Sequence, residues 1–195
     1  MWKAKSKEKM QKGQMMTFLD LVKKRRSVRK YSARRVPREI VTRCIEAARL
    51  APSACNSQPW YFIVVDDEEL KKKLTQAAFS GMYSMNLFAG NASAFVVTVR
   101  DKSTYFARLA GAFRGVEYNL IDIGIACEHL ILQAQEDQVG TCWLGWFNEK
   151  AVKKVLGIPK NKKVDIIISM GYTDDAEPRD KVRKPIEEIC RFNIA

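Results

Sequence analysis

The sequence is poor in metal-binding side chains and has no closely paired cysteines. It contains one histidine, His129, and five cysteines, none of them in a C-x-x-C pair. Zinc sites use cysteine and histidine ligands at short, regular spacings, so this pattern predicts no metal site. An odd number of scattered cysteines is also not the framework of a disulfide-rich secreted domain. We therefore expect reduced and mostly buried thiols in a cytoplasmic protein.

Long uninterrupted apolar runs are also missing. The most apolar stretch, residues 121–132, contains Asp122, Glu128 and His129, whereas a membrane-spanning helix needs about 20 mainly apolar residues. The basic start of the chain is not followed by the apolar segment of a signal peptide. No G-x-G-x-x-G fingerprint follows a predicted strand, so no separate dinucleotide-binding domain is expected. These absences predict a protein that makes no contact with a membrane.

Positive charge is abundant but unevenly distributed. The net charge is +12, and residues 1–40 contain 14 Lys and Arg against 3 Asp and Glu. The remaining residues are close to neutral. A chain of 195 residues is long enough for one hydrophobic core of ordinary size. We therefore expect residues 1–15 to form a basic N-terminal arm and residues 16–195 to form a single domain.

The basic run 23–30 could by composition alone bind nucleic acid. Ser27 and Val28 interrupt the run, and the aromatic residues near it are not spaced as a platform for stacked bases. The neutral body of the chain also lacks the basic surface that nucleic-acid-binding domains carry. Nucleic acid is therefore not an expected partner.

Hydrophobic periodicity and turn residues predict an α+β fold in which helices flank a mixed β-sheet. Helices are expected at 17–24, 37–51, 66–78, 113–135 and 149–156. Strands are expected at 60–65, 94–99, 141–147 and 164–172, with a short apolar turn at 186–189. Pro37 suits the first turn of the second helix, and Pro52 ends that helix.

The stretch 113–135 is expected to be a long central helix. One apolar seam recurs at alternating spacings of four and three residues and consists of Val116, Leu120, Ile123, Cys127, Leu130 and Ala134. A second stripe consists of Ile121, Ile125 and Leu132. A helix that is apolar on more than one side is surrounded by protein, so we expect it in a core or at a subunit interface. His129, which lies among these apolar residues, is expected to have a structural role.

Two polar segments are candidates for ligand binding. Arg25 and Arg29 fall on one side of the chain whether it is helical or extended, with Ser27 between them. Two guanidiniums in this arrangement suit a phosphate or another planar anion. The sequence P-S-A-C-N-S-Q-P-W at 52–60 is a loop of small and amide residues that cannot continue the preceding helix. Together, the charged anchor and the polar loop indicate a ligand with several functional groups.

Several of these residues also have a simpler structural interpretation. Trp60 is expected to pack in the core whether or not the loop before it binds a ligand. Cys55 has no cationic neighbour in the sequence that would lower its thiol pKa, so it is not expected to be a redox nucleophile. Taken alone, the basic segment 181–184 is a solvated run of charge.

The whole set of motifs resembles the nitroreductase family of FMN-dependent flavoproteins, over nearly all of the chain after residue 15. The resemblance is carried by R-x-S-x-R at 25–29, P-S-x-x-N-x-Q-P-W at 52–60, the long central helix, G-T-C-W-L-G at 140–145 and K-x-R-K-P at 181–185. These elements occur in the order that the family has. The resemblance implies an intertwined homodimer with two FMN sites at its interface and the long helix at that interface.

The resemblance also implies which residues contact FMN. The expected contacts are Arg25, Arg26, Ser27, Arg29, Pro52, Ser53, Ala54, Asn56, Asn86, Trp143, Leu144, Gly145, Lys181 and Arg183. No side chain is expected to act as a catalytic acid or base, because in this family the flavin carries the chemistry.

Each group of residues has an implied role. Arg25, Lys181 and Arg183 would bind the phosphate, Arg26 and Ser27 the ribityl chain or the ring, and Arg29 the pyrimidine edge of the ring. The strand end 143–145 would place a backbone N–H near flavin N5, and many relatives have an acidic residue where this chain has Leu144. The loop 52–56 would come from the other subunit.

The resemblance implies an oxidoreductase that takes electrons from NADH or NADPH and passes them, in a ping-pong reaction, to a small-molecule acceptor. Nitroaromatics, quinones and activated alkenes are typical acceptors of the family. The segments 81–91 and 103–114 should form the cleft walls, and the aromatic residues that suit a planar acceptor are Phe79, Tyr83, Phe88, Tyr105, Phe106 and Phe113. Two alternatives remain: a related flavin enzyme that dehalogenates or fragments flavin, and a non-catalytic module that binds flavin or nucleic acid.

Overall fold

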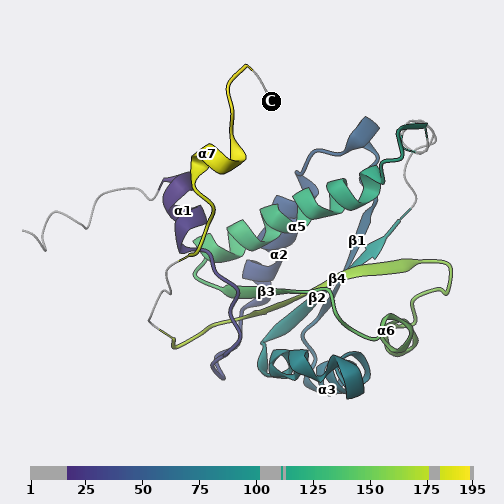
Figure 1. Cartoon of the computed structure of the whole chain (residues 1–195). Helices are drawn as coiled ribbons and strands as arrows, with labels where there is room; N and C mark the ends of the chain where they lie inside the picture. The colour runs from purple at the N-terminus through teal and green to yellow at the C-terminus, as the bar shows by residue number, and fades with distance from the viewer. Residues whose placement is uncertain (1–16, 102–110, 112, 176–180, 194–195) are drawn as a thin grey trace, which may run out of the picture.

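The computed structural model describes residues 17–101, 111, 113–175 and 181–193 (Figure 1). Four strands form one sheet in the order β1-β2-β4-β3, and every neighbouring pair is antiparallel. The strands are β1 (Trp60–Val65), β2 (Ala94–Arg100), β3 (Gly140–Leu144) and β4 (Lys163–Gly171). Ser27 adds an isolated parallel bridge to Thr141 at the β3 edge. The predicted α+β class is confirmed.

Some of the described helices begin with a side-chain cap and others do not. The helices are α1 (Phe18–Lys24), α2 (Arg38–Arg49), α3 (Glu68–Ala78), α5 (Tyr118–Glu136), α6 (Glu149–Leu156) and α7 (Ile186–Ile189), with 3-10 segments η1 (Ala54–Asn56) and η2 (Gly81–Asn91). Asp67 caps α3 by accepting the Leu70 N–H at 2.8 Å, and Asn148 caps α6. Among the helices that the structure describes, none is long and apolar enough to cross a membrane.

Two layers of helix cover the sheet (Figure 1): α2 and α5 lie on one face, and α3 and α6 lie on the other. Alternate residues of the central strands point to opposite faces, as strand geometry requires. Val96 and Ile168 therefore pack under α2 and α5, whereas Phe95, Val97 and Ile167 pack against α3 and α6. The predicted strands are found, but β3 ends at Leu144 rather than Phe147, because the last pair of the β3–β4 ladder joins Leu144 to Ile167.

The central helix is shorter than predicted. It starts at Tyr118 and not at 113, because Gly115 adopts a left-handed conformation (φ 65°) that interrupts the helix. The first seam faces inward over most of its length, and its buried members are Ile123, Cys127, Leu130 and Ala134. Leu120 and Ile121, by contrast, are 44% and 51% exposed. Within one chain, the start of α5 therefore leaves part of its apolar surface uncovered.

Candidate functional site

The segment 25–29 lies along the edge of the sheet beside β3. The Val28 N–H donates to the Thr141 carbonyl at 2.9 Å, and Ser27 bridges the same residue. Val28 is buried directly against Gly140, where an added Cβ would meet the Val28 side chain at 2.6 Å. The absence of a side chain at Gly140 thus permits the close approach. The two motifs R-x-S-x-R and G-T-C-W-L-G, far apart in sequence, are neighbours in the fold.

The basic residues Arg25, Lys181 and Arg183 lie close enough together to influence one another. Burial lowers the pKa of the Lys181 ammonium, and the positive charges of Arg25 and Arg183 lower it further. The Glu128 carboxylate has a smaller, opposite effect on this pKa. In the described part of the chain, no carboxylate lies within ion-pair distance of these three cations. Such a cluster of like charge repels itself until an anion neutralises it, and it therefore suits a phosphate dianion.

Arg25 and Arg29, the two ends of the R-x-S-x-R motif, both influence the pKa of the Cys142 thiol. Burial raises the pKa of Cys142, while the Arg29 guanidinium, a hydrogen bond from Ser27 and the Arg25 guanidinium act to lower it. Arg29 is exposed and Ser27 is half-buried. Arg26 is directed elsewhere, because its guanidinium donates to the Asp175 carbonyl at 2.5 Å. The motif thus presents Arg25, Ser27 and Arg29 around one end of β3.

At the end of β3, the backbone is accessible to a ligand, whereas the side chains of Trp143 and Leu144 point into the core. Trp143 packs against the core under α5, and Leu144 is 2% exposed in the core on the opposite face. Gly145 is exposed, and no described atom would lie within 4 Å of a Cβ added there. Asn86 is close by, since its side-chain amide donates to the Trp146 carbonyl at 2.9 Å. An open backbone edge beside an amide side chain suits the polar rim of a planar ring.

The polar loop at 52–60 is folded tightly upon itself. Pro52 is exposed at its start, and the Ser53 hydroxyl accepts the Gln58 N–H at 2.9 Å. The Gln58 side-chain amide in turn donates to the Asn56 side chain at 3.0 Å. Cys55, Asn56 and Gln58 all have left-handed backbone conformations, with φ of 51°, 51° and 45°. Such conformations cost L-residues about 1–2 kcal/mol each, so surrounding contacts must hold this loop in place.

Replacing Cys55 with glycine is expected to raise the free energy of unfolding by about 1 kcal/mol relative to Cys55→Ala, because glycine adopts the left-handed conformation without steric cost. The Cys55 side chain is exposed, so its removal costs little packing. Chemical denaturation of the two variants measures the difference. Equal stabilities would show that the loop is not strained at Cys55.

Asp122 of α5 lies beneath this loop and was missed as a site residue by the reasoning from sequence. Its carboxylate Oδ1 accepts the Ala54 N–H at 3.0 Å, and the residue is only 3% exposed. In the sequence Asp122 counted only as a polar break in an apolar stretch. A sharper signal was available, because Asp122 falls on the inward stripe with Ala126 and Leu130, at spacings of four residues.

One chain does not bring all the predicted residues together. Figure 1 shows α1 and α7 beside one end of α5, and the turn between α2 and β1, which contains η1, at the other end. The cation cluster lies at the α1 end, since the Lys181 ammonium donates to the Val22 carbonyl at 2.5 Å. The loop that carries Ser53, Ala54 and Asn56 is therefore distant from the cluster within the same chain.

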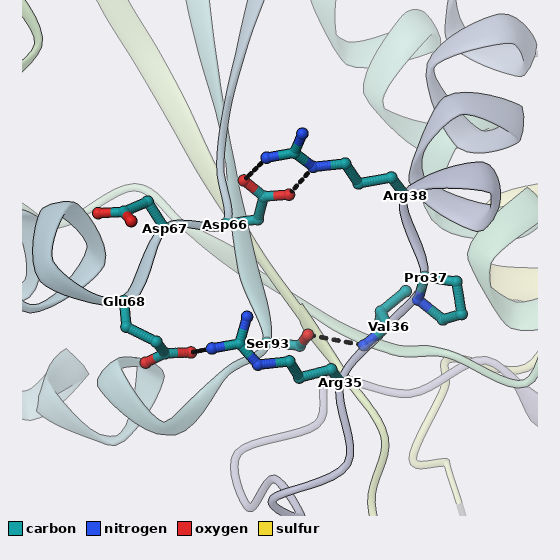
Figure 2. A pocket seen from close by; sticks show the side chains of 8 residues that line it. All are labelled: Arg35, Val36, Pro37, Arg38, Asp66, Asp67, Glu68 and Ser93. Atoms are coloured by element: carbon teal, nitrogen blue, oxygen red, sulfur yellow. Dashed lines mark hydrogen bonds and ion pairs between the residues drawn. The ribbon is translucent and has the colours of Figure 1, made fainter.

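A separate hollow of about 530 Å³ lies between the start of α2 and the start of α3 (Figure 2). Arg38 binds Asp66 through two hydrogen bonds, and Arg35 binds Glu68 at 2.8 Å. The fifth charged group, Asp67, caps α3. The charged groups of this hollow are already paired or engaged as a cap. The cluster of Arg25, Lys181 and Arg183, which has no carboxylate partner among the described residues, is therefore the better anion site.

Not every predicted cleft residue has that role. Phe79 is completely buried, with its ring centroid 6.1 Å from that of Phe95, so it belongs to the core and not to a cleft wall. The Tyr83 ring packs against the Trp146 ring in a tilted arrangement with centroids 5.2 Å apart, and Phe113 is 93% exposed. The basic arm 1–15, Tyr105 and Phe106 lie outside the described residues. His129 has the expected structural contact, with its Nδ1 3.3 Å from the Ala47 carbonyl.

Comparisons with known proteins agree with this arrangement. A sequence model of the nitroreductase family matches residues 22–172. A protein of Archaeoglobus fulgidus with the provisional name NADH dehydrogenase/NAD(P)H nitroreductase is 35% identical over 167 residues, covering 83% of this chain and 88% of that protein. The iodotyrosine deiodinase of Thermotoga neapolitana is 26% identical over 190 residues, covering 92% of this chain and 99% of that protein.

Solved structures show the same fold. An FMN-dependent nitroreductase from Clostridium difficile R20291 has a TM-score of 0.73 and 30% identity, covering 91% of this chain and 100% of that one. A nitroreductase family protein from Clostridium novyi NT has a TM-score of 0.70 and 31% identity, covering 84% of this chain and 90% of that one. With a family match over most of its length and a shared fold, the chain belongs to the nitroreductase family.

Proposed function

We propose that this protein is an FMN-dependent oxidoreductase that uses NADH or NADPH as the electron donor. The observation that carries the proposal is the cluster of Arg25, Lys181 and Arg183, in which burial first, and then the charges of the two arginines, lower the pKa of Lys181. A phosphate would relieve the repulsion among these charges. The structural relative from Clostridium difficile R20291 is named as FMN-dependent. When bound, FMN would supply two-electron transfer between the nicotinamide and a second substrate.

The residues present fit each part of FMN. Arg25, Lys181 and Arg183 would bind the phosphate, and Ser27 and the backbone of Arg26 would contact the ribityl chain or the ring. Arg29, Asn86 and the backbone at 143–145 would hold the polar edge of the ring. The loop residues Pro52, Ser53, Ala54 and Asn56 would complete the site of a second chain, because they lie at the opposite end of α5.

The protein would contribute binding and orientation rather than proton transfer. The proposed contacts are cations, hydroxyls, amides and backbone groups, none of which is a typical acid or base near neutral pH. The donor and the acceptor would use the same open face beside Gly145 in turn, which gives ping-pong kinetics. Nitroaromatics and quinones are the proposed acceptors. Reductive dehalogenation is a second candidate, because a named iodotyrosine deiodinase aligns over 92% of the chain.

The site requires a homodimer in this proposal. Each chain leaves large apolar side chains exposed on α1, the start of α5 and the C-terminal segment, namely Phe18, Leu19, Leu120, Ile121, Ile186, Ile189 and Phe192. These side chains lie at both ends of α5, with α1 and the C-terminal segment at one end and Leu120 and Ile121 at the other, and exposed apolar surface of this kind marks an interaction site. A second copy packed there would bring its own loop 52–58 toward the cation cluster of the first. We also propose that residues 16–195 act as one cytoplasmic domain.

Visible absorption of the purified protein tests the function directly. A flavin spectrum that bleaches when NADH or NADPH is added without oxygen would support the proposal. Subsequent addition of a nitroaromatic or a halogenated tyrosine would show which acceptor restores the spectrum. A protein that stays colourless after incubation with FMN would overturn the proposal.

Replacing Arg29 with alanine is expected to lower the reduction potential of the bound flavin by about 30 mV, or about 1.4 kcal/mol for two electrons. A positive charge at the pyrimidine edge favours the reduced, more negative ring. The effect is modest because Arg29 is exposed and water screens its charge. Reduction by the nicotinamide should slow about tenfold. Lys30→Ala is the matched control, and an unchanged potential in Arg29→Ala would remove Arg29 from the ring edge.

A further inference from the structure

The buried carboxylate of Asp122 is the least expected polar group in the fold. It lies in the second turn of α5, is 3% exposed, and belongs to a stripe whose other members are apolar. Moving a carboxylate out of water costs several kcal/mol unless it gains partners. Its Oδ1 accepts the Ala54 N–H at 3.0 Å, and no described cation lies within ion-pair distance of it.

The second oxygen of this carboxylate has no hydrogen-bond partner within the described part of the chain. Oδ2 is buried and makes no hydrogen bond to any residue that the structure describes. Buried polar atoms in folded proteins almost always have a partner, and a carboxylate oxygen can accept two hydrogen bonds. Among the described side chains, only the Ser32 hydroxyl is in the same condition. An acceptor held in this way indicates a donor that the described residues of the single chain do not supply.

The position of Asp122 links this acceptor to the flavin site. The hydrogen bond to Ala54 ties the polar loop to α5, whereas the other polar contacts of Ser53, Asn56 and Gln58 stay within the loop. The loop backbone is left-handed at three residues, so it has few alternative conformations that keep these contacts. Asp122 is therefore one of the contacts that fix where the loop presents its small and amide groups, together with the Asp101 N–H that donates to the Pro59 carbonyl at 3.0 Å.

We propose that Asp122 is a positioning residue for the flavin site. Through Oδ1 it fixes the loop at Ala54, and through Oδ2 it accepts a hydrogen bond from a donor that arrives when the site is assembled. This inference rests on the proposed function. The donor is either a hydroxyl or N–H group of FMN or a polar group of the second subunit, and both offer the same chemistry to the carboxylate.

Two variants separate the roles of the two oxygens. Asp122→Asn keeps an oxygen for the Ala54 N–H but replaces the second acceptor with a donor. Asp122→Ala removes both acceptors. Ser32→Ala is the matched control, because it deletes the other buried side-chain oxygen that has no partner among the described residues and leaves the loop bond intact. The readouts are the Tm of the FMN-free protein, the Kd for FMN from flavin fluorescence, and the dissociation of the dimer by sedimentation with and without FMN.

Asp122→Asn should keep the Tm of the FMN-free protein. It should weaken either FMN binding or dimerisation about tenfold, as expected for a lost hydrogen bond to a charged group. A weaker Kd for FMN with unchanged dimerisation assigns the donor to FMN. Weaker dimerisation without FMN assigns it to the second subunit. Asp122→Ala should in addition lower the Tm.

Asp122→Asn that binds FMN and dimerises like the wild-type protein would overturn the inference, whatever Asp122→Ala does. Failure of the proposed function is a different result, because the wild-type protein would then bind no FMN. In that case dimerisation is still informative: weaker dimerisation of Asp122→Asn would show a donor from the second subunit, and unchanged dimerisation would show that no such donor exists.

Discussion

Replacing Arg25 with alanine is expected to weaken FMN binding about a hundredfold, because hydrogen bonds to a charged group are worth about 1.5–3 kcal/mol. A guanidinium can give a phosphate two parallel hydrogen bonds, and alanine gives none. Arg25 also belongs to the cluster with Lys181 and Arg183 that has no described carboxylate partner. The Kd for FMN, measured by quenching of flavin fluorescence, tests this expectation.

The Tm of the FMN-free Arg25→Ala protein should stay the same or rise slightly, although its affinity for FMN falls. Arg25 depresses the pKa of Lys181, so its removal relieves repulsion in the empty cluster and should raise that pKa toward the ordinary value. A variant that binds FMN poorly and keeps its Tm is thus the expected result. Arg35→Ala is the matched control, because Arg35 is an exposed arginine that is paired with Glu68 in the other hollow. Equal losses of affinity in both variants would place the phosphate elsewhere.

The sequence predicted the elements whose signals are local. The inward seam of α5, with Ile123, Cys127 and Leu130, follows from its helical spacing alone, and these residues are buried. The end of α6 at Gly157 is also a local signal, since Gly157 has φ 66° and caps the helix in the left-handed conformation. The predicted positions of the four strands are likewise confirmed, apart from their ends.

Features set by contacts between distant residues could not be predicted in the same way. Phe79 follows α3 directly and resembles a cleft residue by type, but it is buried against Phe95 in strand β2. The role of Asp122 depends on a loop 68 residues away in sequence. The left-handed backbone at Cys55 and Gln58 has no signal in their residue types, which ordinarily avoid that conformation. For Phe79 and Asp122 a tertiary contact decides the outcome, whereas hydrogen bonds within the loop accompany the left-handed backbone at Gln58.

The candidate site combines features that the sequence predicted with contacts that it could not predict. Segment 25–29 and the strand end near Gly145 were recognised as motifs, but periodicity alone does not show that Val28 pairs with Thr141. Lys181 was assigned to the phosphate only through the family resemblance, and the structure adds its electrostatic coupling to Arg25. The roles of these residues toward FMN remain predictions, which the Arg25 and Arg29 variants test.

Replacing Ile121 with glutamate is expected to convert the proposed dimer into monomers and, as a consequence, to reduce FMN binding more than any single contact variant. Ile121 is 51% exposed on α5, beside the exposed Leu120. In the proposed dimer this surface is buried, and a buried unpaired carboxylate costs several kcal/mol. In a monomer, the cation cluster would retain the phosphate contacts but lose the loop 52–58 of the second chain. Sedimentation measures the assembly, and flavin fluorescence measures the binding.

Gln76→Glu is the matched control, because it adds the same charge at an exposed position of α3 on the opposite face of the sheet. It should leave both assembly and FMN affinity unchanged. A dimer that survives Ile121→Glu would place the interface away from the start of α5. Monomers that bind FMN with wild-type affinity would be a more serious contradiction. They would show that one chain completes the site, although its loop and its cation cluster lie at opposite ends of the same helix.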